Sequence, residues 1–263
     1  MRANPGRDES SHYALTMHRT LEVPVDSIAA AEIAGPLADR LEVCSDLASE
    51  GWSPDPWLVR EIRARTPARV VAMIRPRVPG AIASLQPEAF RCTPAMLDAC
   101  LREIDRLGRA GADSVAIGPL VGREAIDHHA CERMLGVARD HGMTVSFLRT
   151  LDLLDDRDRA VRELADLGFD RLLTAGVRGW DASVEPLAVR VAQVARTIAI
   201  ANEQASRIGC APMQVMPCGG VRASNAGAWL AITPHLHASC RRGDAIDPEE
   251  VKLLRAAIGP RGG

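Results

Sequence analysis

The segment LDACLREIDRLGRAG, residues 97–111, leads into the short apolar segment DSVAIG, residues 113–118. In the first segment, apolar residues recur at the i, i+3, i+4 and i+7 spacing of an amphipathic helix, whereas the second is an apolar run of strand length. The first segment ends on Gly111 and the second begins on Asp113, and glycine readily takes the left-handed conformation that ends a helix. These residues predict a helix that stops at a glycine and is followed by a buried strand.

The same arrangement recurs along the chain. The helical pattern DRAVRELADLGFD (158–170) ends on Gly168 and Asp170 and precedes the apolar segment DRLLTA (170–175). Strands that alternate with helices of this length predict right-handed βαβ units and a parallel sheet. The strand segments that we predict on this basis are 20–25, 39–44, 69–76, 113–118, 143–148, 170–175, 213–217 and 235–239.

Eight strands in this alternation favour an α/β fold, a closed (β/α)8 barrel of the TIM type in a single domain. The chain has 263 residues, close to the roughly 250 that such a barrel needs. An open doubly wound sheet is the alternative, but the dinucleotide fingerprint GxGxxG does not follow the first strand. We therefore predict a barrel over residues 20–258, a disordered tail over residues 1–19 and a flexible tail over residues 259–263.

Composition narrows the function classes. The net charge of −2 lacks the basic excess of a nucleic-acid-binding surface, and no run of eighteen apolar residues is present to span a membrane. The first twenty residues lack the apolar stretch of a signal peptide, and the seven cysteines form no CxxC pair, so we expect a cytoplasmic protein with reduced thiols. Lys252 is the only lysine, which argues against Schiff-base chemistry. No nicotinamide, flavin or pyridoxal phosphate cofactor is expected.

Charged and polar side chains fall inside or just after several predicted strands, where a barrel is normally packed with aliphatic residues. They are Glu22, Glu42, Arg75, Arg77, Arg149, Asp152, His237 and Ser239. One interpretation is a buried ion network in which Arg75 neutralises Glu22 and Glu42, because unpaired buried charges are costly. The other is a ligand site at the C-terminal strand ends, where the guanidinium groups of Arg77 and Arg149 would bind a carboxylate or a phosphate.

Glycines and cysteines also stand at predicted strand ends. Gly219 and Gly220 follow the seventh strand and precede the helical pattern RASNAGAWLA. In many barrels the backbone N–H groups of this loop and of a nearby helix N-terminus bind phosphate, although a plain tight turn also uses two glycines. Cys44 and Cys218 follow the second and seventh strands, and thiolates favour Cu(I). Strand alternation places Cys240, after the eighth strand, on the opposite face from the polar residues.

Several stretches carry a resemblance to a known family: LEVPVDSIAAAEIAGPLADRLEVCSDLASEGWSPD (21–55), MIRPR (73–77), ELADLGFDRLLTAG (163–176), MPCGGVRASN (216–225), HASC (237–240) and IDPEEVKLLRAAI (246–258). In this order they resemble the copper homeostasis protein CutC family. The resemblance implies a TIM-type barrel, a cytoplasmic location, copper binding and a homo-oligomer, either a dimer or larger. Pro24 stands where the family usually has cysteine, and Leu148 stands where it has histidine, so two plausible Cu(I) ligands are absent.

Two function hypotheses follow. In the first, the chain is a cytoplasmic copper homeostasis protein of the CutC type whose partner is a copper ion, bound as Cu(I) by Cys44 with help from Cys218. In the second, it is a barrel enzyme or binder that acts on a small anionic or phosphorylated metabolite. The arginines and the Gly-Gly turn would then hold the anion, and Glu22 or Glu42 would act as acid or base. The residues alone do not decide between an enzyme and a binding protein.

Overall fold

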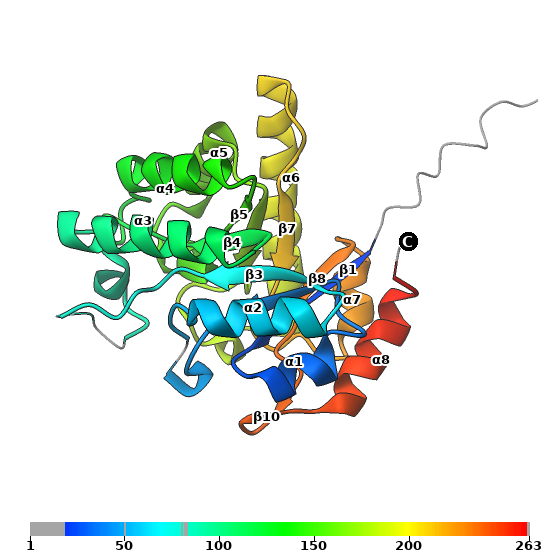
Figure 1. The fold of residues 1–263 in the computed structure, drawn as a ribbon. Coiled ribbons are helices and arrows are strands. Elements are labelled where there is room, and N and C mark those ends of the chain that lie inside the picture. Colours follow the sequence, from blue (N-terminus) through cyan, green and yellow to red (C-terminus); the bar gives the residue numbers. More distant parts are fainter. Residues whose placement is uncertain (1–18, 50, 80, 82–83, 262–263) are drawn as a thin grey trace, which may run out of the picture.

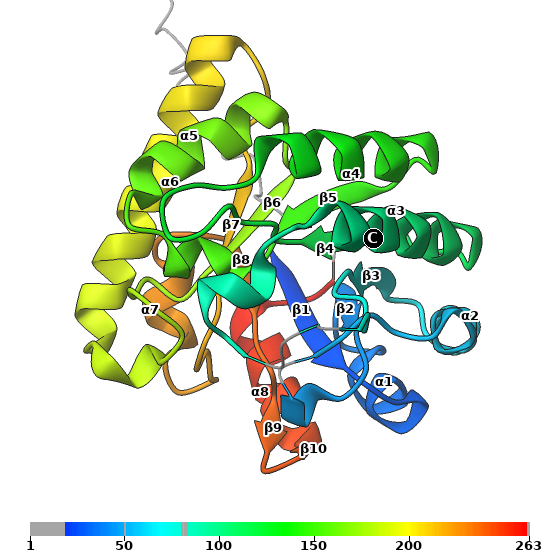
Figure 2. The ribbon, with the colours of Figure 1, turned by 90° about the vertical axis from the view of Figure 1, so that its left-hand side faces the viewer.

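The computed structural model describes residues 19–49, 51–79, 81 and 84–261, and it confirms the predicted barrel. Of the two predicted tails, residues 1–18 and 262–263 lie outside the described residues. Parallel strands alternate with helices, and the helices surround the strands (Figure 1 and Figure 2). The barrel strands are β1 (Thr20–Val25), β2 (Arg40–Val43), β3 (Arg69–Met73), β4 (Ser114–Ile117), β5 (Thr144–Phe147), β6 (Arg171–Thr174), β7 (Gln214–Pro217) and β8 (His235–His237).

The strands form one sheet in the hydrogen-bonded order β7-β6-β5-β4-β3-β2-β1-β8. Its two outer strands, β7 and β8, lie next to each other. The hydroxyl group of Thr233, just before β8, donates a hydrogen bond of 3.0 Å to the carbonyl of Val215 in β7. This side-chain hydrogen bond joins β7 and β8 in place of a ladder of backbone hydrogen bonds. The barrel is therefore nearly closed.

The helices begin and end at residues with clear physical roles. They are α1 (Ile28–Ala34), α2 (Pro56–Arg65), α3 (Pro94–Arg109), α4 (His128–Asp140), α5 (Arg157–Leu167), α6 (Leu187–Ile208), α7 (Ala226–Leu230) and α8 (Pro248–Ile258). Thr93 caps α3 by accepting a hydrogen bond from the backbone N–H of Met96, and α5 ends at Gly168 with φ of 79°, as predicted. No helix of the described segments is both long and apolar enough to cross a membrane.

The aspartates that recur before strands have a structural purpose. Each one accepts a hydrogen bond from a backbone N–H at or next to the start of the preceding strand. Asp39 accepts from Leu21 at 2.7 Å, and Asp113 accepts from Val70 at 2.8 Å. Asp170, just before β6, accepts the equivalent hydrogen bond from Val145 of β5 at 2.8 Å. At these three places the recurrent Asp therefore ties the beginning of one strand to its neighbour.

Side-chain alternation separates a dry layer outside the strands from a polar interior. Leu21, Val23 and Leu41 point outward, are fully buried and belong to the main hydrophobic core under the helices. Residues of the opposite parity point into the barrel. In strand register, Glu22 lies opposite Arg40 on one side and opposite His237 on the other. The interior of this barrel therefore contains charged side chains in neighbouring positions.

Some predicted strand ends are wrong. β3 ends at Met73, before the predicted residue 76, and β8 ends at His237, before the predicted residue 239. After β8 the chain forms a small antiparallel hairpin from β9 (Arg241–Arg242) and β10 (Ala245–Ile246), which the sequence analysis did not predict. The hairpin leads into α8 (Figure 2).

Candidate functional site

Glu22 lies at the centre of the polar interior and pairs with residues of both neighbouring strands. Its carboxylate accepts a hydrogen bond of 2.6 Å from Nε of Arg40 and lies 3.0 Å from Nδ1 of His237. All three side chains are largely buried. Burial alone would raise the pKa of Glu22, but the charge of Arg40 and the hydrogen bond with His237 lower it below its usual range. The lowered pKa favours the ionised carboxylate of Glu22, which pairs with residues of both neighbouring strands.

The prediction that Arg75 neutralises the two buried glutamates is wrong. Arg75 follows the end of β3, and its guanidinium group donates hydrogen bonds to the carbonyls of Gly51 at 3.3 Å and Ser84 at 2.8 Å. The same group lies 4.5 Å from the ring centre of Trp52 and 5.1 Å from that of Phe90. Because the chain leaves the barrel after Met73, this side chain connects loops at the rim.

Glu42 lies near His237 on the side that faces the C-terminal strand ends. Its Oε2 atom is 3.8 Å from Nε2 of His237, and its buried Oε1 atom has no hydrogen-bond partner among the described residues. Burial raises the pKa of Glu42 to about 7, with the charge of Glu22 adding to the effect and that of His237 opposing it. Burial alone would lower the pKa of His237, but its hydrogen bond to Glu22 and the two carboxylate charges raise it.

A cavity of about 260 Å³ opens at the C-terminal ends of the strands, above this group. Eight of the residues predicted from sequence line it: Glu42, Arg75, Arg149, Cys218, Gly219, Gly220, His237 and Ser239. Four others predicted with them are not part of its lining: Glu22, Cys44, Arg77 and Asp152. The strand ends thus bring together most of the predicted ligand-binding residues.

Arg149 is held at this cavity by buried partners. Its Nε donates to Asp152 at 3.1 Å, its Nη2 donates to the carbonyl of Trp180 at 2.7 Å, and the guanidinium lies 4.5 Å from the Trp180 ring centre. Asp152 is fully buried and also accepts hydrogen bonds from the hydroxyl of Thr174 and the N–H of Ala175. Burial raises the pKa of Asp152, and the charge of Arg149 opposes that shift. Asp152 therefore positions Arg149 and does not itself face the cavity.

The Gly-Gly turn differs from the prediction. Gly219 and Gly220 have φ of 66° and 86°, and a Cβ atom on Gly219 would lie 3.3 Å from Nη1 of Arg149. The helix expected directly after the turn begins only at Ala226 and has five residues, so its N-terminus is not at the turn. Instead, Arg190 of α6 donates hydrogen bonds to the carbonyls of Cys218 and Gly219. The absence of a side chain at Gly219 therefore leaves room for the guanidinium group of Arg149.

Two cavity residues with hydrogen-bonding side chains escaped the sequence analysis. Trp180 lies in the connection after β6, and no strand pattern marks it. Arg241 begins the unpredicted hairpin, and its Nη2 donates to Asp26 at 2.7 Å while its buried Nε has no partner among the described residues. The predicted Arg77 instead forms an exposed ion pair with Asp46.

The predicted thiol ligands lie in two separate apolar clusters. Cys44 packs with Val71 and Met73, whereas Cys218 packs with Leu173 and Met216. Burial raises the pKa of both thiols, which disfavours the thiolate form that binds copper. Within the described ranges, no group of three or more His, Cys, Asp or Glu side chains is arranged to hold a metal ion. The described side chains therefore present no assembled thiolate site.

Comparison with known proteins agrees with this fold. The chain matches the sequence profile of the CutC family over residues 19–241. A CutC family protein of Rhizobium meliloti (strain 1021) is 32% identical over 227 residues, which cover 84% of this chain and 81% of that protein. A CutC family protein of Caulobacter vibrioides (strain NA1000 / CB15N) is 36% identical over 192 residues, covering 71% of this chain and 72% of the relative.

Solved structures are similar at lower identity. A putative copper homeostasis protein CutC from Streptococcus agalactiae superposes with a TM-score of 0.68 at 20% identity, covering 84% of this chain and 98% of the other. A 3-keto-L-gulonate-6-phosphate decarboxylase from Vibrio cholerae superposes with a TM-score of 0.60 at 13% identity, covering 92% and 98%. At these identities the structures show a shared fold alone. The sequence profile and the relatives show more, and by them this chain belongs to the CutC family.

Proposed function

We propose that the cavity at the C-terminal strand ends binds a small hydroxylated anion and exchanges a proton with it through Glu42. One observation carries this proposal. Glu42 and Arg241 both line the cavity, and the buried acceptor Oε1 of Glu42 and the buried donor Nε of Arg241 have no partner among the described residues. Buried polar atoms without partners are costly, so a ligand that satisfies both atoms would gain binding energy.

The surrounding residues specify the chemistry of that ligand. Arg149 and Arg241 both line the cavity, and guanidinium groups bind carboxylates and phosphates through paired hydrogen bonds. Glu42 would accept a hydrogen bond from a ligand hydroxyl group. Because its pKa is about 7, this carboxyl group can release or take up a proton near neutral pH. The volume of about 260 Å³ suits a small metabolite.

Calorimetric titration with malate, tartrate and citrate tests the proposal. We expect at least one of them to bind with a Kd below roughly 1 mM, and we expect Glu42→Gln and Arg241→Gln to weaken that binding about tenfold each. Glu132→Gln and Arg60→Gln, at exposed helical positions, make the same charge changes and serve as controls. The proposal fails if none of the probes binds, or if the cavity variants and the controls bind equally well.

A second candidate function is the handling of Cu(I) as cargo, and we place it at Cys44. The supporting observation is a second sulfur atom: a Cβ atom on Gly51 would lie 2.9 Å from Sδ of Met73 and 3.5 Å from Cβ of Cys44. The side chains of Cys44 and Met73 therefore border the same small space, and thiolate and thioether sulfur atoms both favour Cu(I). A putative copper homeostasis protein is among the similar structures. Such a role suits the cytoplasm, where thiols stay reduced.

An anaerobic competition between the protein and a Cu(I) chelator tests the second candidate. The metal must displace the thiol proton, so binding should strengthen as the pH rises. We expect Cys44→Ser to lose the site and Met73→Leu to weaken it. Cys131→Ser, a change at another buried thiol on α4, should leave it intact. If Cys44→Ser retains wild-type affinity, copper does not bind at this place.

A further inference from the structure

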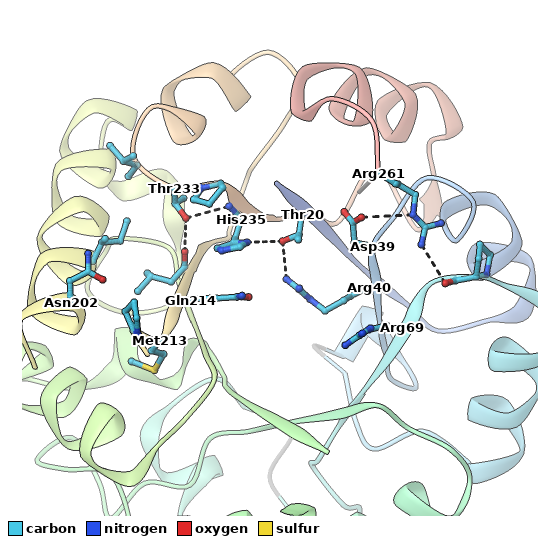
Figure 3. Close-up of a pocket in the computed structure, with 16 residues that line it drawn as sticks. Thr20, Asp39, Arg40, Arg69, Asn202, Met213, Gln214, Thr233, His235 and Arg261 are labelled. Carbon is cyan, nitrogen blue, oxygen red and sulfur yellow. Dashed lines mark hydrogen bonds and ion pairs between the residues drawn. The ribbon is translucent and has the colours of Figure 1, made fainter. Parts of the chain in front are cut away.

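A second and larger cavity, of about 860 Å³, opens at the opposite end of the barrel, around the N-terminal strand ends. Figure 3 shows this cavity, with side chains from several strands directed towards its centre. Residues of β1, β2, β3, β7 and β8, together with α6, contribute to its wall. The N-terminal face of a TIM barrel ordinarily serves stability, so a cavity of this size with charged walls calls for a physical explanation.

Two arginines from neighbouring strands form one wall. Arg40 and Arg69 lie opposite each other in the register of β2 and β3, and both point into the cavity (Figure 3). Arg40 donates to Glu22, and its Nη2 also donates to the hydroxyl of Thr20 at 3.2 Å. For the guanidinium group of Arg69, by contrast, the described part of the chain provides no hydrogen-bond or ion-pair partner. Arg40 is therefore already paired within the barrel, whereas the neighbouring Arg69 can bind a ligand.

Positive charge exceeds negative charge inside this end of the barrel. Arg171 of β6 is buried here as well. Burial lowers its pKa and the charges of Arg40 and Arg69 lower it further, while the charges of Glu22 and Asp170 oppose them. The hydroxyl groups of Ser114 and Thr144 accept hydrogen bonds from Arg171 but carry no charge.

Two of the three acidic side chains at the strand starts are paired with cations outside the barrel, and only Asp170 acts on Arg171. Asp39 is paired with Arg255 of α8, and Asp113 is paired with Arg63 of α2. Both of these cations come from helices and lie outside the barrel interior. Two buried arginines, Arg40 and Arg171, therefore act on one buried glutamate, and the exposed Arg69 beside Arg40 adds a further positive charge at the cavity.

The opposite wall has a different character. Ile198 of α6, Met213 before β7 and Ile232 before β8 provide an apolar surface. Between this surface and the arginines stands Gln214, whose buried Oε1 atom has no partner among the described residues. Figure 3 shows Gln214 directed into the cavity. A ligand here would meet cations on one side and apolar groups with an unpaired acceptor on the other.

We propose that this N-terminal cavity is a second ligand site, which binds a phosphate monoester. The phosphate dianion would lie between Arg40 and Arg69, and the organic part would pack against the wall formed by Ile198, Met213 and Ile232. A hydroxyl or amino group of the ligand would donate to Gln214. The site is separate from the cavity at the C-terminal strand ends, because the two open at opposite ends of the same strands and share no lining residue.

Titrations of the full chain with inorganic phosphate, ribose 5-phosphate and AMP test the proposal. We expect each to bind, with the two esters binding about tenfold tighter than inorganic phosphate because only they reach the apolar wall. Arg69→Gln should weaken all three about tenfold or more, and Arg60→Gln, an exposed change of the same charge on α2, should have no effect. Arg241→Gln, at the other cavity, should also leave these affinities unchanged, whereas it weakens malate or citrate binding in the test above.

Melting temperatures distinguish a ligand site from a structural role of Arg69. Without phosphate, Arg69→Gln should melt at the wild-type temperature or above it, because the change removes repulsion with Arg40 and Arg171. When phosphate is added, the melting temperature of the wild type should rise more than that of Arg69→Gln, since a ligand stabilises the folded state that binds it. Equal affinities in the wild type and Arg69→Gln would overturn the proposal. So would equal affinities for inorganic phosphate and both esters.

Discussion

Replacing Glu42 with glutamine should change how the stability of the protein depends on pH. The side chain keeps nearly the same shape, but it can no longer ionise. In the wild type, burial raises the pKa of Glu42 from 4.5 to about 7, and the charge of Glu22 adds to this rise. The unfolded chain has no such surroundings, so its Glu42 ionises near the ordinary value.

The sign and size of the effect follow from these two pKa values. Below pH 4.5 the folded and unfolded chains both hold the proton. Between pH 4.5 and about 7 the unfolded chain releases it while the folded protein keeps it, so the folded state loses stability as the pH rises. A difference of about 2.5 pKa units corresponds to about 3 kcal/mol, and the loss is complete above pH 7. The glutamine variant escapes this loss.

Urea unfolding followed by circular dichroism at pH 5, 6, 7 and 8 measures the difference. From pH 5 to pH 8, the unfolding free energy of Glu42→Gln relative to the wild type should rise by about 2.5 kcal/mol, because part of the loss already occurs below pH 5. Glu132→Gln, at an exposed position on α4, should show no such rise. The reasoning is refuted if the difference between Glu42→Gln and the wild type stays constant within roughly 0.5 kcal/mol over this range.

Two further changes test the interior and the turn. Arg40→Gln leaves Glu22 buried without its arginine and should reduce the unfolding free energy by about 3–5 kcal/mol in urea denaturation, whereas Arg60→Gln should change it by less than about 0.5 kcal/mol. Gly219→Ala places a side chain on a residue with φ of 66° and 3.0 Å from Cβ of Ala175, so we expect a loss of about 1–2 kcal/mol and weaker anion binding. A Cβ atom at Gly136 in α4 would have no atom within 4 Å. Gly136→Ala should therefore raise the unfolding free energy by about 0.5–1 kcal/mol, which is measured as a higher melting temperature.

The fold could be predicted because its signals are local. The helical spacing before Gly168 and the apolar run after Asp170 depend only on residues near in sequence, and both correspond to elements of the structure. Strand ends were less predictable, because the apolar pattern does not mark them. β3 stops at Met73, although the apolar residue Ile74 follows and its N–H still donates to the carbonyl of Ala116 in β4. The backbone of the next residue, Arg75, exchanges hydrogen bonds with Ser53 of a loop. The hairpin of β9 and β10 gives little pattern, since each strand has two residues.

The candidate site was predictable in part for the same reason. Alternation along a strand is a local property, so the sequence by itself determined that Glu22 and Glu42 share one face of their strands and that Cys240 lies on the other. It could not determine which cation meets Glu22, because that depends on the register between strands. Arg40 stands opposite Glu22 in the register of β1 and β2, two residues before Glu42 in the chain.

Only the tertiary structure decided how these residues combine. The sheet curves until β8 lies beside β1, and this brings His237 to Glu22 although 215 residues separate them in the chain. The same closure encloses two cavities at opposite ends of the strands and leaves Arg69 facing one of them. Which side chains point inward is decided residue by residue along each strand. Which of them touch is decided by the stagger and curvature of the closed barrel, where distant parts of the chain meet.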